Sequence, residues 1–289
     1  MDYRIGMLWI GGPLSWTEQM CIKSYLRVGY EVDLYHYDEV YNVPEGVNLL
    51  DAREILSGDC IYRYFLNGSP AIHADKFRYR LLRAREDIIW SDTDVYCLRP
   101  YEPRNGYFLA WGTKNMVFIS VLKLPVDSPA LHDIINFTEE DHPVPPWLSK
   151  GAKKYLQIRK ALGWPAHVTK LQWTVWGSRS LTYFMQQHGE VKYVMEEHSL
   201  YPIPANRKED MLSGRCRLQD FRMDREVYCI HLYTGWLKDR LAREKDLGKF
   251  SDTLLMDMVK EQGVEVDLNF RPASNMPEFV RKIRRKLKV

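Results

Sequence analysis

The chain of 289 residues lacks the features of a disulfide-stapled or membrane-spanning protein. Its five cysteines are scattered, odd in number and never spaced as Cys-x-x-Cys. This usage argues against a disulfide framework and a zinc site, and it predicts a reducing compartment. No apolar run approaches the roughly 18 residues of a membrane-spanning helix, and no basic-plus-apolar leader is evident. We therefore expect a cytoplasmic protein.

Strong net charge and internal repeats are also missing. The formal charge of +3 is too small to indicate binding to nucleic acid, so we expect no nucleic-acid partner. The hydrophobic content of 45% is enough to form a full core. Without a repeat or a low-complexity linker, the sequence predicts one domain over residues 1–270, followed by a basic tail over residues 271–289.

Short apolar strands alternate with amphipathic helices along the chain. A strand, a helix that begins with the capping box Ser15–Glu18 and ends at Gly29, and a second strand open the sequence, which predicts a parallel sheet with a right-handed crossover. The fold class expected is α/β, with a mainly parallel sheet flanked by helices and helical segments towards the C-terminus. Strands are expected at 5–10, 31–37, 88–90, 106–111, 116–122 and 227–232, and helices at 15–28, 72–85, 129–137, 150–162 and 173–188.

Two carboxylates follow the most apolar of these strands. Asp92 and Asp94 come directly after Ile88, Ile89 and Trp90, which form a continuous apolar run typical of a buried parallel strand. Side chains repeat with period two in a strand, so the two carboxylates are expected to point the same way. Adjacent like charges repel unless a divalent cation or a shared proton offsets them. The pattern therefore indicates a metal–diphosphate site, with solvated carboxylates in a turn as the alternative.

Other candidates lie near the ends of further expected elements. The turn after Trp9 contains glycine, which allows a ligand to approach the backbone closely. His231 ends a late strand and could add a nitrogen ligand, although a strand-end histidine is more often simply hydrogen-bonded. Asp75 and Arg78 share one helix face, either as a surface ion pair or as a carboxylate for sugar hydroxyls beside a guanidinium for phosphate.

Several of these segments, taken in order, resemble the DXD-containing glycosyltransferases of the family-32 type, which have the GT-A fold. The resemblance is carried by segments 8–12 (LWIGG), 74–82 (ADKFRYRLL), 89–100 (IWSDTDVYCLRP), 176–182 (WGSRSLT), 201–204 (YPIP) and 231–236 (HLYTGW). It implies a transferase that moves a sugar from a nucleotide-diphosphate sugar to a glycan or lipid-linked acceptor, with retention of anomeric configuration. Relatives often place an asparagine where this chain has Phe118 or Ile119, so acceptor chemistry is not carried over.

The resemblance assigns roles to the charged candidates. Asp94 would bind the divalent metal, usually Mn²⁺ and otherwise Mg²⁺, and Asp92 would contact the donor and support the metal. Asp75 and Arg78 would hold the donor sugar and its diphosphate. His231 would be a late ligand of the metal or the diphosphate.

The resemblance also implies a nucleotide-sugar pocket. Trp9 and Ile10 would lie against the base, with Gly11 in the same turn. Thr93, between the two carboxylates, would belong to the pocket as well. Trp236 would help to close the site.

Two other classes of function remain open from the residues. A phosphatase of the haloacid dehalogenase type also uses an apolar strand that ends in Asp-x-Asp, and Asp252 and Asp257 weakly imitate its second acidic pair. Its nucleophile normally follows the first strand, whereas a strand–helix–strand unit precedes Asp92 here. The third possibility is an inactive fold that only binds sugar nucleotides.

The C-terminal residues 277–289 combine six basic side chains with an apolar stripe at helical spacing. This pattern is typical of a peripheral anchor on an anionic membrane surface, and a solvated basic tail is the alternative. We accordingly expect a protein that can also lie on the inner face of a membrane.

Overall fold

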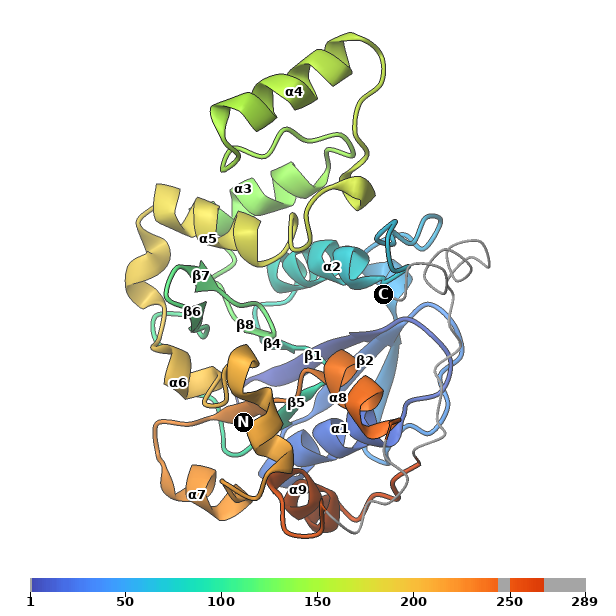
Figure 1. Cartoon of the computed structure of the whole chain (residues 1–289), viewed down its shortest axis with the longest axis vertical. Coiled ribbons are helices and arrows are strands. Elements are labelled where there is room, and N and C mark those ends of the chain that lie inside the picture. Colours follow the sequence, from blue (N-terminus) through green and yellow to red (C-terminus); the bar gives the residue numbers. More distant parts are fainter. Residues whose placement is uncertain (1, 244–249, 268–289) are drawn as a thin grey trace. The chain divides into compact units, whose positions relative to one another are not determined.

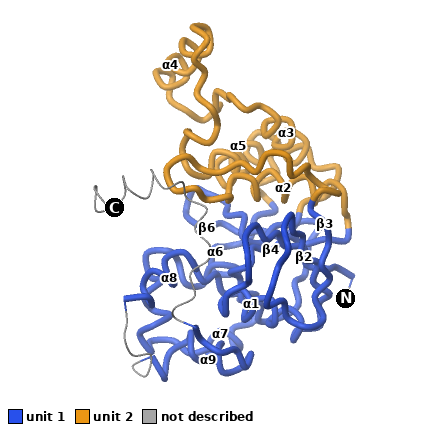
Figure 2. Tube along the Cα trace, turned by 90° about the vertical axis from the view of Figure 1, so that its right-hand side faces the viewer, with its two compact units in different colours: residues 1–52, 87–123, 193–273 blue, residues 53–86, 124–192, 274–289 orange. Residues whose placement is uncertain are grey.

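The computed structural model describes residues 2–243 and 250–267. The chain divides into two compact units, coloured separately in Figure 2. The described part of unit 1 comprises residues 2–52, 87–123, 193–243 and 250–267, and that of unit 2 comprises residues 53–86 and 124–192. A single domain over 1–270 stays a prediction. The basic tail predicted at 271–289 lies outside the described residues.

Unit 1 is built on a five-stranded sheet of order β3-β2-β1-β4-β8 (Figure 1). The first four strands pair in parallel and β8 runs antiparallel to β4. The predicted α/β class with a mainly parallel sheet is therefore confirmed. The strands are β1 (Arg4–Trp9), β2 (Val32–His36), β3 (Val47–Asp51), β4 (Ile88–Ser91) and β8 (Val121–Leu122).

The crossover helix of unit 1 begins and ends where its sequence dictates. Helix α1 (Trp16–Val28) starts at Ser15, whose backbone N–H donates to the Glu18 carboxylate at 3.0 Å in a capping box. It stops at Gly29, which has a φ of 98° that glycine adopts without steric cost. The predicted strand–helix–strand opening and its parallel pairing are confirmed.

Smaller elements complete unit 1. Two short antiparallel pairs join β5 with β9 and β6 with β7. Helical segments towards the C-terminus are present as predicted. The elements are β5 (Val95–Cys97), β6 (Trp111–Thr113), β7 (Met116–Val117), β9 (Cys229–His231), α6 (Glu197–Leu200), η4 (Ala205–Leu212), α7 (Leu218–Met223), α8 (Thr234–Leu241) and α9 (Leu254–Gln262).

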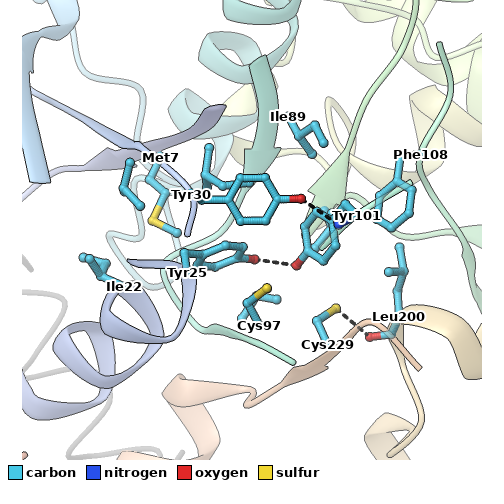
Figure 3. Close-up of a cluster of buried hydrophobic side chains, with 14 of the residues drawn as sticks. Met7, Ile22, Tyr25, Tyr30, Ile89, Cys97, Tyr101, Phe108, Leu200 and Cys229 are labelled. Atoms are coloured by element: carbon cyan, nitrogen blue, oxygen red, sulfur yellow. Dashed lines mark hydrogen bonds between the residues drawn. The ribbon is translucent and has the colours of Figure 1, made fainter. Parts of the chain in front are cut away.

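A cluster of tyrosines occupies the core of unit 1 (Figure 3). The hydroxyls of Tyr25 and Tyr101 are 2.7 Å apart, and the Tyr101 backbone N–H donates to the Tyr30 hydroxyl at 2.6 Å. The Tyr25 hydroxyl also lies 2.7 Å from Oγ of Ser91, the last residue of β4. Because each of these buried hydroxyls is hydrogen-bonded, together they hold the end of β4 in place.

Unit 2 is helical. Its helix α2 carries Lys76, which is buried, pairs with Glu139 at 3.0 Å and lies 5.5 Å from the centroid of the Trp176 ring. The elements are α2 (Ala71–Ala84), α3 (Pro129–Thr138), α4 (Lys150–Ala161), η2 (Val168–Lys170), α5 (Ser178–Gln187) and η3 (Glu190–Tyr193); η1 (Ala52–Glu54) lies at the boundary of the units.

The structure corrects several of the predicted elements. The helix expected from residue 173 begins only at Ser178, since Thr174 has a φ of 65° and Gly177 is the N-cap. Of the strands expected over 106–111 and 116–122, only the short β6, β7 and β8 are found, and Phe108 and Ala110 form isolated bridges with Lys123 and Met195. Strand β3 was not predicted from the sequence, because it is a largely exposed strand at the sheet edge without an apolar run.

Candidate functional site

The candidate site lies at the carboxyl edge of the parallel sheet in unit 1. Strands β1 and β4 are neighbours, and β2 and β3 extend the sheet on the other side of β1. The crossovers therefore reverse direction between β1 and β4, and ligands of open α/β sheets bind at such a reversal, beyond the carboxyl ends of the strands. The turn that starts after Trp9 and the carboxylate of Asp92 follow these two strands.

Asp92 and Asp94 lie in a turn between two sheets. Strand β4 belongs to the five-stranded sheet and β5 pairs with β9, so the chain changes sheets between Ser91 and Val95. The turn is closed by the Val95 N–H, which donates to the Asp92 carbonyl at 3.3 Å. The two carboxylates are therefore close together, but the predicted reason is wrong. The turn between the sheets brings them together, and not the side-chain period of a strand.

The Asp92 side chain is fixed by groups on both sides. The indole N–H of the buried Trp90 donates to Asp92 Oδ1 at 2.9 Å. The Asp92 backbone N–H donates to the Ser120 carbonyl at 2.7 Å, next to the pairing of β4 with β8. Because both contacts come from buried residues, the carboxylate is held at a defined place on the sheet edge.

Asp94 is brought to His231 by the antiparallel pairing of β5 with β9. Val95 lies opposite His231, and the Leu232 N–H donates to the Asp94 carbonyl at 2.9 Å. Asp94 Oδ1 lies 3.3 Å from His231 Nε2. Asp94 Oδ2 accepts from the backbone N–H and the hydroxyl of Thr234, both at 3.1 Å, and so caps the start of α8.

The surroundings of Asp94 and His231 favour the charged form of each side chain. Burial raises the pKa of Asp94, but the neighbouring His231 and the Thr234 donors outweigh it and hold the pKa well below its usual range. Burial lowers the pKa of His231, and the attraction of Asp94 and Asp92 outweighs it, so that pKa is raised. The site thus collects negative charge that a proton on the imidazole or a cation can offset.

Asp92, Asp94 and His231 each offer one ligand atom within 4.8 Å of the others, and within residues 2–243 and 250–267 no other such group of three occurs. Two carboxylate oxygens and an imidazole nitrogen form a donor set that suits Mn²⁺. Mg²⁺ prefers oxygen ligands, which the two carboxylates can supply. His231 Nδ1 is buried and has no hydrogen-bond partner in the described part of the chain. The residues present therefore fit a divalent cation.

Two residues of this site were missed in the sequence. Ser120 accepts from Asp92 through its carbonyl, and its Oγ lies 3.3 Å from His231 Nε2, so it ties the two together. Nothing in the sequence signals this contact, which depends on the pairing of β4 with the later β8. Thr234 carried a weak signal, since it stands within the segment 231–236 that resembles a family landmark.

The turn after β1 is tightly organised. The Trp9 indole N–H donates to the Gly12 carbonyl at 2.8 Å, and the half-buried ring packs against the core. Gly11 has a φ of 149°, in the region that favours glycine. Ile10 and Thr93 are half-buried.

Trp236 lies in the first turn of α8. It is half-buried, and Lys208 Nζ lies 4.9 Å from the centroid of its ring. A cavity of about 330 Å³ beside it is lined also by Glu209, Gly235 and Asp239. Its role in closing the site stays a prediction.

Asp75 and Arg78 belong to unit 2, on α2. Arg78 Nη2 lies 3.1 Å from Asp75 Oδ1, and both side chains are buried, so the alternative of a surface ion pair is wrong. Arg78 Nε also donates to the Ala74 carbonyl at 3.3 Å. The predicted role of this pair towards a donor at Asp92 and Asp94 stays a prediction.

No family model and no curated protein sequence matches the chain. Among solved structures it is similar to the glycosyltransferase GlyE of Streptococcus pneumoniae TIGR4, with 14% identity and a TM-score of 0.31 over 55% of this chain and 43% of that chain. The apo form of GlyE has the same identity and TM-score, over 61% of this chain and 46% of the GlyE chain. The chain thus spans less than half the length of either structure. Similarity at this level decides neither the fold nor the activity.

Proposed function

We propose that this protein is a metal-dependent glycosyltransferase with a GT-A-like fold. It would move a sugar from a nucleotide-diphosphate sugar, with UDP or GDP as the nucleotide, to a glycan or lipid-linked acceptor. The observation that carries the proposal is the convergence of Asp92, Asp94 and His231 at the carboxyl edge of β4, where the sheet reverses its order. The resemblance of segments between residues 8 and 236 to family-32 enzymes supports the same reading.

The proposed chemistry divides among the residues of the site. A bound divalent cation would supply Lewis acidity to the departing diphosphate. Asp94 would offer Oδ1 to that cation while Thr234 engages Oδ2, and Asp92 and His231 would complete the ligands. Trp90 orients Asp92 through its indole N–H.

The donor would be held by the remaining candidates. Asp75 would accept from the sugar hydroxyls and Arg78 would hold a phosphate oxygen, since a guanidinium suits that task. The turn Trp9–Gly11 would lie against the base. The bond from the anomeric carbon to the diphosphate would break, and the acceptor oxygen would bond to that carbon from the same face as its proton passes to the leaving group. This gives retention without a protein nucleophile.

The phosphatase alternative finds less support in the site. Asp257, which would belong to its second acidic pair, is bound by Arg217 at 2.6 and 2.8 Å and accepts from the Leu218 N–H. Asp252 is exposed and contacts Ser251. Neither joins the group formed by Asp92 and its partners.

The decisive test is Mn²⁺-dependent hydrolysis across a panel of UDP- and GDP-sugars. Asp94→Asn keeps an oxygen that can accept from Thr234 but removes the anionic ligand, so we expect the rate to fall at least about a hundredfold. Chelation of the metal should abolish the wild-type rate. Thermal stabilisation by Mn²⁺ alone should also be lost in this variant.

A matched control exists in unit 1. Asp224 also contacts a histidine, His198 Nε2, at 2.6 Å, but is exposed and lies outside the site. Asp224→Asn should hydrolyse the donor at the wild-type rate. Phosphate release from simple monoesters by the wild type would favour the phosphatase. Binding of a nucleotide-sugar with no turnover would favour the binding module.

A further inference from the structure

Helix α4 is the least covered helix of unit 2. It begins at Ser149, whose side chain accepts from the Ala152 N–H at 3.3 Å, and of its residues only Leu156 is buried. Figures 1 and 2 show it standing away from α3 and α5 of the same unit. Most of its surface is therefore available to a partner.

The exposed side of α4 carries large apolar side chains at helical spacing. Tyr155, Ile158 and Leu162 are three and four residues apart and so share one face. Their exposed fractions are 59%, 47% and 66%, and that of Trp164, just beyond the helix, is 73%. Exposed apolar side chains are ordinary singly, but a contiguous group marks an interaction surface. We call these four residues the α4 face.

Hydrogen bonds hold Trp164 beside the helix. The Trp164 N–H donates to the Arg159 carbonyl at 2.9 Å, and Arg159 Nε donates back to the Trp164 carbonyl at 3.0 Å. The Arg159 guanidinium also lies 5.7 Å from the centroid of the Tyr155 ring. The α4 face is thus an organised surface.

An apolar groove continues this surface. It has a volume of about 200 Å³ and runs from Tyr155 along the buried side of α4. Its lining includes Trp147, Leu148, Leu156, Leu171 and Val175. The lining contains no charged side chain and is mainly aliphatic and aromatic, so the groove suits an acyl chain better than a sugar.

Positive charge surrounds the α4 face. The helix carries Lys150, Lys153, Lys154, Arg159 and Lys160, and its sequence contains no Asp or Glu. Lys160 pairs with Glu140 at 3.1 Å, and the shared exposure of both leaves that pair weak. An apolar stripe with a tryptophan and a cationic flank is the pattern of a helix that lies in a membrane interface.

We propose that the α4 face docks on an anionic lipid membrane. The apolar side chains would enter the boundary between headgroups and acyl chains while the lysines stay with the phosphates. Within residues 2–243 and 250–267 no helix has the length and apolar character of a membrane span. Helix α4 has 12 residues, fewer than the roughly 20 that a bilayer requires, and it would lie on the surface. The proposal concerns different residues from the tail at 277–289 and does not depend on the sugar-transfer reaction.

The test is flotation of the full chain with vesicles of phosphatidylcholine alone or mixed with phosphatidylglycerol. We expect binding to the anionic vesicles that weakens as salt is raised. Leu162→Ser combined with Trp164→Ser should lower the partition coefficient at least about tenfold, since two exposed apolar side chains leave the interface. Leu49→Ser with Met223→Ser, which changes exposed apolar residues of unit 1, should bind as the wild type does.

Charge reversal gives a second, independent readout. Lys153→Glu with Lys154→Glu should lower binding to anionic vesicles by about a thousandfold, at roughly 1 kcal/mol for each of the two charges removed and the two charges added. Lys114→Glu with Arg225→Glu changes exposed cations elsewhere and is the matched control, expected to have a smaller effect. Thermal melting of every variant checks that the fold is retained.

Several results would overturn the proposal. If both α4 variants bind vesicles as the wild type does, any membrane affinity belongs to other residues. If the wild type binds neutral and anionic vesicles equally well, the lysines have no role in docking. Self-association of the wild type, lost with Leu162→Ser and Trp164→Ser, would make a second copy the occupant. Asp94→Asn should float as the wild type does, so failure of the proposed reaction and failure of docking are distinguishable.

Discussion

Among single residues, Asp94 combines a structural and a chemical task on its two oxygens. Oδ2 caps α8 through Thr234, and Oδ1 faces His231. Replacement by alanine would remove both tasks at once. Replacement by asparagine keeps an acceptor for the cap and removes the charge, so it isolates the proposed ligand role.

The cysteines should differ sharply in reactivity. Cys60 is exposed, whereas Cys21, Cys97 and Cys229 are buried. Burial raises the pKa of the Cys229 thiol to about 12 and that of the Cys21 and Cys97 thiols as well. Since the thiolate is the nucleophile, alkylation of the folded protein near pH 7.5 should label Cys60 within minutes and spare these three.

Peptide mass spectrometry after a time course of alkylation measures this directly. Cys216 is half-buried and its pKa is raised to about 11, so it should react more slowly than Cys60. In denaturant, labelling of all five cysteines should become equally fast. Rapid labelling of Cys97 in the native protein would contradict the packing between β5 and β9.

At the scale of elements, the β6–β7 hairpin depends on a close approach at Gly112. A Cβ there would lie 1.9 Å from Cγ of Phe118, whose ring packs against Tyr201 at a centroid distance of 5.1 Å. The half-buried ring packs against the core of unit 1, so an added methyl group would force it to shift. Gly112→Ala should therefore lower the free energy of unfolding by about 1–3 kcal/mol, as overpacking does.

Urea unfolding followed by circular dichroism measures that change. Gly151 offers a matched control, because it lies in α4 with no atom within 4 Å of the added Cβ. Gly151→Ala should raise stability by roughly 0.5–1 kcal/mol through helix propensity. An equal effect of both substitutions would show that Phe118 does not confine position 112.

For the whole molecule, the sequence predicts the elements that its local patterns specify. The capping box at Ser15 and the apolar run before Asp92 define α1 and β4, and both are found. Strand β3 was not predicted because its residues are mostly exposed. Helix α5 starts later than predicted because Thr174 adopts a positive φ. Such features depend on tertiary context rather than on periodicity.

The candidate site likewise combines residues that a local pattern predicts with contacts that depend on the tertiary structure. Asp92 and Asp94 are readable from a local motif, and His231 from its place at a strand end. Their meeting depends on the pairing of β5 with β9, and the contacts of Ser120 depend on β8. Pairings between strands that are distant in sequence leave no local pattern, so the sequence could name the candidate ligands but not the residues that support them.

The pH dependence of global stability should contain a contribution from His73. This buried residue accepts from the Tyr62 N–H at 3.4 Å, and burial, together with Lys76 and Arg63, lowers its pKa from 6.5 to about 4. The unfolded state therefore binds the proton more tightly. The free energy of unfolding should be unaffected by this group above pH 6.5 and fall by about 3 kcal/mol on acidification to pH 4.

Chemical unfolding at several pH values checks this contribution. His73→Gln should flatten the dependence between pH 4 and 6.5, whatever its effect on stability at neutral pH. Stability above pH 7 provides the control, because the wild type and His73→Gln should differ there by an amount that does not depend on pH. A slope that His73→Gln does not alter would assign the acid sensitivity to other groups.

The change of sheets at Asp92–Asp94 also has a consequence for folding. One carboxylate is anchored through β4 and β8 and the other through β5 and β9, so the three ligand atoms meet only after both sheets have formed. Contacts of such long sequence separation are late and slow to form. A cation that binds there recognises the native state alone, and its binding energy adds to the stability of unit 1. On the proposed function, the supply of the cation would therefore govern how long unit 1 survives proteolysis.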